Sequence, residues 1–186
     1  MSSILDKPAV RQVALPITLA QYHELGASGI IDERTELLRG VIVRKMIKSP
    51  RHSWIVEKMA ATLRACLSDT YVLRQEQPLS FLDSEPEPDL AVVQSSSDEY
   101  RHSHPQTAFL VIEAAITSED LDREKAEIYA AGNVKEYWLV IGEKQLVEKY
   151  ANPVNGRYTL VETLGFDRTI RSTTIEAVQM DLTVLI

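Results

Sequence analysis

Cysteine is nearly absent from this sequence, and the one cysteine, Cys66, narrows the class of protein. A single thiol excludes an internal disulfide and a cysteine-rich zinc site, which fits a reducing cytoplasm. No apolar run approaches the roughly 20 residues that a membrane helix needs, and residues 1–12 lack the apolar core of a secretory signal. We therefore expect a cytoplasmic protein with no membrane partner.

Three common catalytic motifs are also absent. The chain has no glycine-rich phosphate loop, no serine-centred nucleophile elbow and no H-E-x-x-H zinc motif. These absences exclude nucleotide hydrolysis of the P-loop type and the commonest hydrolase sites. An excess of basic residues is lacking too, because the net charge is -7. This charge disfavours broad binding of a phosphate backbone, but it allows a local basic surface and an acidic metal centre.

The residues that are present describe a soluble globular protein, with 45% hydrophobic and 25% charged residues. The 186 residues suit a single domain with a well-filled core, beginning with a loose tail at residues 1–14. The order of segments predicts an α/β (α+β) fold in which helices flank a central mixed sheet. Periodicity and turn residues place helices at 19–25, 50–68 and 119–131, and strands at 35–38, 41–43, 71–82, 88–93, 109–115, 136–141, 144–150, 157–162 and 181–186.

Two buried strands each carry one carboxylate that an apolar strand would normally exclude. Asp89 stands near the start of the strand 88–93, and Glu113 stands near the end of the strand 109–115. If these strands pair antiparallel, both acids lie at the same end of the sheet. Burial and repulsion penalise such a pair unless a cation joins them, so we expect a divalent metal and a nuclease. Taken alone, Asp89 could be a turn residue and Glu113 could pair with an arginine.

Lys125 is the third candidate, because it shares a helical face with Leu121 and Tyr129. This position predicts an ammonium directed at the metal site, where it would stabilise charge that develops on a phosphate. The alternative is that its methylene stem covers apolar surface while the ammonium reaches water. Asp122 could orient this lysine, although a role at the helix cap is the simpler account.

Four further residues are weaker candidates. Glu36 opens an apolar strand and His52 lies in the first turn of the helix at 50–68, and either could belong to the site. A solvated strand end and an edge-of-core histidine explain these two residues as well. His102 and His104 alternate in a polar loop, but two histidines without supporting ligands are weak evidence for zinc.

Six short segments occur in a specific order between Glu36 and Tyr158. They are Glu36-Leu37-Leu38-Arg39-Gly40, Ser49-Pro50-Arg51-His52, Pro88-Asp89-Leu90-Ala91-Val92-Val93, Val111-Ile112-Glu113, Asp122-Arg123-Glu124-Lys125 with Tyr129-Ala130, and Glu136-Tyr137-Trp138-Leu139-Val140. Together they resemble the Uma-type family of proposed restriction endonucleases, a domain of unknown function within the PD-(D/E)XK nuclease superfamily. Each segment alone is weak evidence, whereas six in this order are fairly specific.

The resemblance assigns roles to individual residues. Asp89 corresponds to the aspartate of the superfamily motif, and Glu113 corresponds to its first acid. Ala115 stands where the lysine of the motif would be, and Lys125 matches a helix position to which such families move that lysine. Glu36 and His52, not counted in the motif itself, match residues that recur beside the site.

The resemblance also implies a restriction-endonuclease-like core, Mg²⁺ as cofactor with Mn²⁺ as a substitute, DNA as substrate, and a homodimer with a contact near 150–158. Asp89, Glu113 and the carbonyl of Ala114 would hold the ion among oxygen ligands. The leading hypothesis is hydrolysis of a DNA phosphodiester by metal-activated water, with RNA as a weaker variant. The alternative is a catalytically inactive nuclease-fold module that binds nucleic acid or protein, which the charge of -7 and Ala115 favour.

Overall fold

The computed structural model describes residues 8–11, 13–95, 99–116 and 118–186. Its α-helices are α1 (Pro8–Arg11), α2 (Leu19–Ala27), α3 (Pro50–Cys66) and α4 (Glu119–Ala131), and its 3-10 helices are η2 (Glu99–Arg101) and η3 (Leu182–Leu185). Its strands are β1 (Thr35–Leu38), β2 (Val41–Arg44), β3 (Tyr71–Gln75), β4 (Leu90–Gln94), β5 (Leu110–Ala115), β6 (Glu136–Ile141), β7 (Leu146–Val154), β8 (Arg157–Gly165), β9 (Thr169–Arg171) and β10 (Gln179–Asp181).

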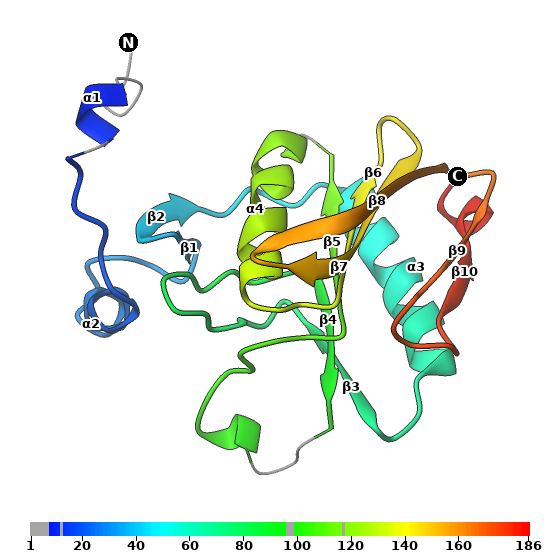
Figure 1. Cartoon of the computed structure of the whole chain (residues 1–186), viewed down its shortest axis with the longest axis horizontal. Coiled ribbons are helices and arrows are strands. Elements are labelled where there is room, and N and C mark those ends of the chain that lie inside the picture. Colours follow the sequence, from blue (N-terminus) through cyan, green and yellow to red (C-terminus); the bar gives the residue numbers. More distant parts are fainter. Residues whose placement is uncertain (1–7, 12, 96–98, 117) are drawn as a thin grey trace.

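The central sheet has the strand order β3-β4-β5-β6-β7-β8, and the hairpins β1-β2 and β9-β10 form two small sheets of their own. In the central sheet, β5 and β6 run parallel and the other four neighbouring pairs run antiparallel. A parallel pair needs a crossover connection, and α4 supplies it between β5 and β6. The sheet is therefore mixed and flanked by α3 and α4, as predicted, while α1 and α2 lie apart from it (Figure 1).

The alternation of side chains along β5 divides the core into two layers. Leu110 and Ile112 belong to a buried cluster on the α3 side of the sheet. Val111 and Ala115 belong to a second cluster on the α4 side. Glu113 has the same parity as Val111 and Ala115, so the strand directs its carboxylate toward α4.

The β1-β2 hairpin is held close to the segment that leads into β4. Arg39 (φ 50°) and Gly40 (φ 74°) both adopt left-handed backbone conformations, as in a two-residue type I′ turn, which confirms the predicted hairpin. A Cβ added to Gly40 would lie 2.3 Å from the Cβ of Pro16, so the turn packs closely. The bridge between Leu37 and Glu85 joins the hairpin to the approach to β4.

The strand predicted at 71–82, with an interruption or bulge at Pro78, is confirmed as far as Gln75 and is wrong beyond it. The structure ends β3 at Gln75, where Glu76 adopts a positive φ of 53°. Pro78 lacks the amide hydrogen that a strand would need for its ladder. The chain then turns through an irregular segment before it enters β4.

The strand predicted at 181–186 is also wrong. The structure places β10 at Gln179–Asp181, pairs it with β9, and continues as the 3-10 helix η3. Asp181 terminates the strand because its side chain accepts a hydrogen bond from the amide of Thr183, which starts the 3-10 turn.

The predicted tail at 1–14 is described only in part. Residues 1–7 and 12 lie outside the described residues, and Pro8–Arg11 forms α1. In contrast, α4 and β6 have the bounds that the sequence predicted. No helix in the described ranges is long and apolar enough to span a bilayer.

Candidate active site

An open cavity of about 300 Å³ lies where β4 begins and β5 ends. Its lining comes from β1, the connection between β2 and α3, the starts of α3 and β4, the end of β5, and α4. These segments are far apart in the sequence, and the sheet and the α4 crossover bring them together. All five catalytic candidates from the sequence line this cavity, namely Glu36, His52, Asp89, Glu113 and Lys125.

Asp89 and Glu113 meet because β4 and β5 pair antiparallel, with Leu90 opposite Ile112. The amide of Asp89 donates to Glu113 Oε2 at 3.2 Å. The amide of Ala114 in turn donates to Asp89 Oδ2 at 2.9 Å. These reciprocal bonds fix both carboxylates at one end of the sheet, where both are almost completely buried.

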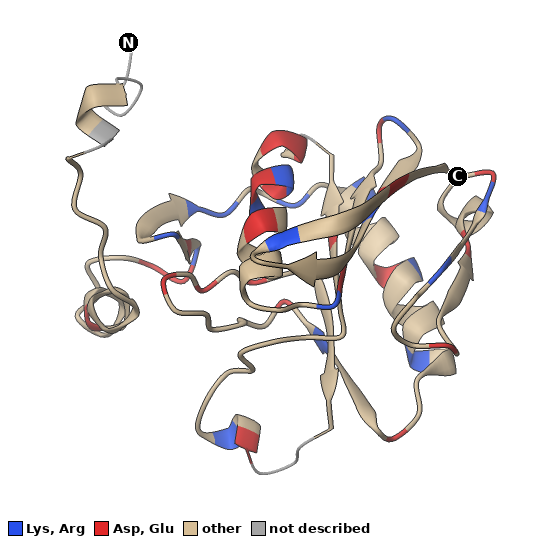
Figure 2. Cartoon of the chain, viewed as in Figure 1, with Lys and Arg blue, Asp and Glu red and all other residues tan. Residues whose placement is uncertain are grey.

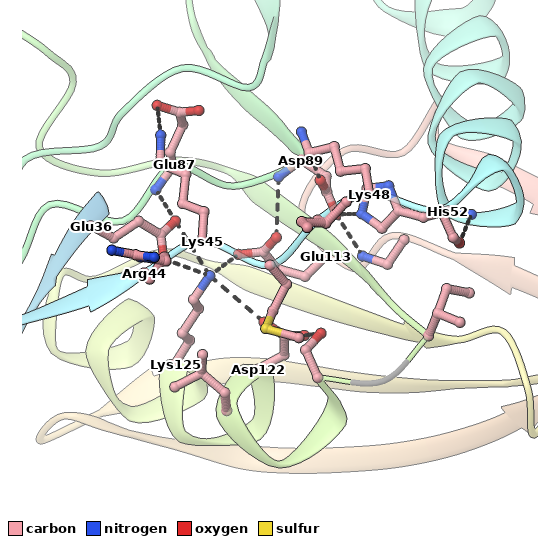
Figure 3. A pocket seen from close by; sticks show the side chains of 17 residues that line it. Glu36, Arg44, Lys45, Lys48, His52, Glu87, Asp89, Glu113, Asp122 and Lys125 are labelled. Carbon is pink, nitrogen blue, oxygen red and sulfur yellow. Dashed lines mark hydrogen bonds and ion pairs between the residues drawn. The ribbon is translucent and has the colours of Figure 1, made fainter. Parts of the chain in front are cut away.

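Lys125 lies among three carboxylates, and its side chain is buried with them (Figure 3). Its Nζ lies 3.0 Å from Glu113 Oε1, 3.2 Å from Glu36 Oε2 and 3.6 Å from Asp122 Oδ1. The alternative in which the ammonium reaches water is therefore wrong. The helical face of α4 directs this side chain toward the sheet.

Glu36 is a buried member of this group and not a solvated strand end. Besides its ion pair with Lys125, it accepts a hydrogen bond at Oε1 from the amide of Glu87, at 2.8 Å. The β1-β2 hairpin thus contributes a carboxylate on the side of the cavity opposite α4.

His52 contacts the site through Asp89. Ser49 caps α3 by accepting from the His52 amide, and Pro50 occupies the first helical turn, as the sequence predicted. The His52 Nε2 atom lies 3.0 Å from Asp89 Oδ2. Its Nδ1 atom is buried and has no hydrogen-bond partner among the described residues. The histidine is therefore positioned to orient Asp89.

Two further side chains of α4 belong to the site: Tyr129, whose role the sequence did not reveal, and Asp122, for which the sequence offered a contact with Lys125 as one alternative. The Tyr129 hydroxyl donates to Glu113 Oε1 at 2.8 Å. Asp122 accepts from the Ser118 hydroxyl at 2.5 Å and faces Lys125, so its expected role at the helix cap is wrong. Asp122 lies three residues before Lys125 and Tyr129 lies four residues after it, so all three share a helical face.

The buried charges shift two pKa values in a consistent direction. Burial raises the pKa of Glu113, the Lys125 ammonium opposes this rise, and nearby carboxylates add to it, so that the value reaches about 8. Burial alone would lower the pKa of Lys125, but Glu113, Glu36 and Asp122 together raise it above its ordinary value. Lys125 is thus charged at neutral pH, whereas ionisation of Glu113 is disfavoured.

The donor set has the chemistry that a hard divalent ion requires, but it is not a preformed cage. Among the described residues, no three His, Cys, Asp or Glu side chains are arranged to hold a metal ion. Mg²⁺ is usually held by only one or two carboxylates and keeps several waters, so this finding is compatible with Mg²⁺. The carboxylates of Glu36, Asp89, Glu113 and Asp122 line the cavity and provide the oxygen ligands that such an ion prefers. The residues therefore fit such an ion.

The backbone carbonyl of Ala114 is also placed to serve as a ligand. The Ala115 carbonyl accepts from the amide of Gly142 on the β6 side of the strand. Carbonyls alternate along a strand, so that of Ala114 points to the other side, where its own amide bonds to Asp89. Ala114 is also one of the residues that line the cavity.

Other candidates lie away from this cavity. The ring of His104 is 3.5 Å from the guanidinium of Arg74, and neither His102 nor His104 lines the cavity. Tyr150 and Tyr158, expected on an exposed strand, are half-buried and pack against each other with ring centroids 6.0 Å apart.

Comparisons with known proteins agree with this geometry. Residues 19–184 match the family model Uma2, described as "Putative restriction endonuclease". The fold is similar to the crystal structure of a "putative nuclease belonging to DUF820" from Anabaena variabilis ATCC 29413, with a TM-score of 0.76 and 17% sequence identity. That match covers 91% of this chain and 97% of the other. No curated protein matches the sequence. Because the family model covers most of its length, this chain belongs to the Uma2 family of nuclease-fold proteins.

Proposed function

We propose that this protein is a Mg²⁺-dependent DNA endonuclease that hydrolyses phosphodiester bonds, with Mn²⁺ as a substitute ion. The convergence of Asp89, Glu113 and Lys125 on one open cavity carries the proposal. Membership of a family whose model is described as "Putative restriction endonuclease" supports the nuclease class. The carboxylate oxygens that line the cavity are the ligands that a hard divalent ion prefers, and they support an ion as cofactor.

Asp89, Glu113 and the carbonyl of Ala114 would hold the Mg²⁺. When bound, the ion would supply a water of lowered pKa and an electrophilic contact for a phosphate oxygen. Hydrolysis would add water to phosphorus and break the bond to one sugar oxygen, which would take up a proton and leave as a hydroxyl group. The open side of the cavity gives the phosphate access to this position.

The protein side chains have separate tasks in this reaction. Lys125 offsets negative charge that develops on the phosphate in the transition state, and burial strengthens this effect. His52 and the Ala114 amide fix Asp89 at Oδ2, and Lys48 lies 3.8 Å from its other oxygen, Oδ1. Tyr129 holds Glu113 at Oε1. These hydrogen bonds position the ligands before substrate arrives.

A second candidate function is a catalytically inactive module that binds nucleic acid or protein. One observation favours it: Lys125 already forms ion pairs with three carboxylates, so the acids could persist as a structural network. In that case removal of an acid would change stability but no enzymatic activity.

Cleavage of supercoiled plasmid in Mg²⁺ or Mn²⁺ tests the proposal. We expect nicking by the wild type, loss of nicking in Glu113→Ala, and wild-type nicking in Glu124→Ala, which removes an exposed acid from the same region. Equal nicking by wild type and Glu113→Ala would point to a contaminating nuclease. No nicking under any condition would favour the binding module. A parallel RNA substrate distinguishes the two nucleic acids.

A further inference from the structure

The connection between β2 and α3 carries a concentration of positive charge that the overall composition hides. Residues 37–56 contain no Asp or Glu, although the whole chain has a net charge of -7. The same stretch has five basic residues, which are Arg39, Arg44, Lys45, Lys48 and Arg51. Figure 2 shows Lys and Arg along the path from β2 to α3. This local charge is opposite in sign to that of the rest of the protein.

Three of these basic residues line the cavity of the candidate active site, together with two apolar residues between them. Lys45 Nζ lies 2.7 Å from Glu87 Oε2, and Lys48 Nζ lies 2.8 Å from Glu76 Oε2. Lys48 also lies 3.8 Å from Asp89 Oδ1. We call the segment 44–48 the basic lip.

The ion pairs of the lip do not commit its lysines to a structural role. Both lysines and both acidic partners are partly exposed, and such pairs contribute only about 0–1 kcal/mol. A lysine can therefore exchange its carboxylate for a phosphate at little cost. This differs from Lys125, which is buried among its partners and cannot leave them without a large penalty.

The tip of the lip is apolar and uncovered. Ile47 is 96% exposed and Met46 is 58% exposed, whereas the flanking basic residues surround them with charge. Isolated apolar side chains at a basic surface are suited to contacts with sugars and with base steps, into which such side chains can insert. An acidic peptide would satisfy the lysines but would leave these two side chains without a specific partner.

We infer that the basic lip binds the DNA strand that flanks the cleaved phosphate, with Lys45 and Lys48 on neighbouring phosphates and Ile47 against the bases or sugars. The inference rests on the proposed function, because a phosphodiester that enters the cavity must continue across its rim. Figure 3 shows Lys45 and Lys48 from this rim extending beside the acids of the site. The lip thus makes up for the acidic net charge where the substrate enters.

Salt-dependent binding tests this inference without cleavage. The probe is a short fluorescein-labelled DNA duplex in Ca²⁺, measured by fluorescence anisotropy over a series of KCl concentrations. Each phosphate contact contributes about 0.9 to the slope of log K against log salt for duplex DNA. We therefore expect Lys45→Gln and Lys48→Gln each to reduce the slope by about this amount. Ile47→Ser should weaken binding several-fold and leave the slope unchanged.

Arg157→Gln is the matched control, because it removes an exposed positive charge on β8 that does not line the cavity. An unchanged slope in both lysine variants, or an equal loss in Arg157→Gln, would overturn the inference. Equal effects with polyglutamate in place of DNA would also overturn it, since they would indicate a general polyanion surface.

Plasmid nicking, measured separately, distinguishes the two proposals. Nicking that depends on Glu113, together with unchanged slopes in the lip variants, would refute the lip and leave the nuclease intact. Reduced slopes in the lip variants, together with a wild type that never nicks, would support DNA binding by the lip and refute the nuclease.

Discussion

Replacement of Glu113 by glutamine should change how the stability of the metal-free protein depends on pH. Burial raises the pKa of this carboxyl to about 8, against the opposing charge of Lys125, from an ordinary value of 4.5. Glutamine has nearly the same shape but does not titrate. The variant therefore isolates the free energy that the folded protein loses when Glu113 ionises inside the site.

The sign follows from linkage between protonation and folding. The folded state binds the Glu113 proton more tightly than the unfolded state, so this contribution is fully present below about pH 4.5 and is lost as pH rises to about 8. At 1.36 kcal/mol per pKa unit, the interval corresponds to at most about 5 kcal/mol. Glutamine forfeits the hydrogen bond from the Asp89 amide at 3.2 Å, which costs about 1 kcal/mol at every pH.

The two effects predict a crossing of the stability profiles. Glu113→Gln should be about 1 kcal/mol less stable than the wild type near the ordinary pKa of glutamate and several kcal/mol more stable above about pH 8. Urea denaturation in EDTA at several pH values measures both differences, and Glu124→Gln serves as the exposed control. If the difference in free energy of unfolding between wild type and variant stayed constant across the pH range, the raised pKa of the buried Glu113 would be refuted.

Three other predictions concern the ion, the lysine and the assembly. Mn²⁺ should raise the Tm of the wild type but not of Glu113→Ala. At neutral pH the binding of Mn²⁺ should release about one proton from Glu113, which calorimetry in buffers of different ionisation enthalpy would detect. Binding of Mn²⁺ without proton release would contradict this prediction. Lys125→Met should destabilise the metal-free protein by about 3–5 kcal/mol, because it leaves buried carboxylates without a compensating charge. The same variant should have no nicking activity. A urea midpoint equal to that of the wild type would contradict the prediction. We propose that β8, at the edge of the central sheet, forms the homodimer contact. Val161→Lys places a charge at an exposed position of this edge strand and should therefore yield monomers in light scattering. A monomeric wild type would exclude the contact.

The sequence predicted best those helices and strands whose ends are marked by residues that stop them. The helix α4 ends before Gly132-Asn133, and Asn133 adopts a positive φ of 56°. Residues of these two types commonly terminate helices, so the local sequence predicts this end. At the end of β3 the signal is less precise, because Pro78 marks a break but stands three residues beyond Gln75. Glu76 takes a left-handed conformation although glutamate has no preference for it, and tertiary contacts impose the turn. Boundaries of this second kind are not encoded in local composition.

A residue of the site was predictable where its type is unusual for its position in a helix or strand. Glu113 stands out in an apolar strand, because an unpaired buried acid is costly. Tyr129 was indistinguishable from an ordinary core residue, since an aromatic ring on an apolar helical stripe usually packs, and its hydroxyl partner lies on a different element. Lys48 follows a strand in an irregular segment, where no periodicity predicts the direction of a side chain. Only the three-dimensional arrangement places it beside Asp89.

The displaced lysine has a physical explanation in the packing of α4 against β5. Ala115 lies on the same face of β5 as Glu113 and is completely buried, in one cluster with Ala126 of the helix. Small side chains at both positions let the helix approach the sheet closely, and a lysine at position 115 would force them apart. That close approach is also what brings the Lys125 ammonium within 3.0 Å of Glu113. Ala115 and Lys125 are therefore two parts of one arrangement, and the alanine does not by itself argue for an inactive site.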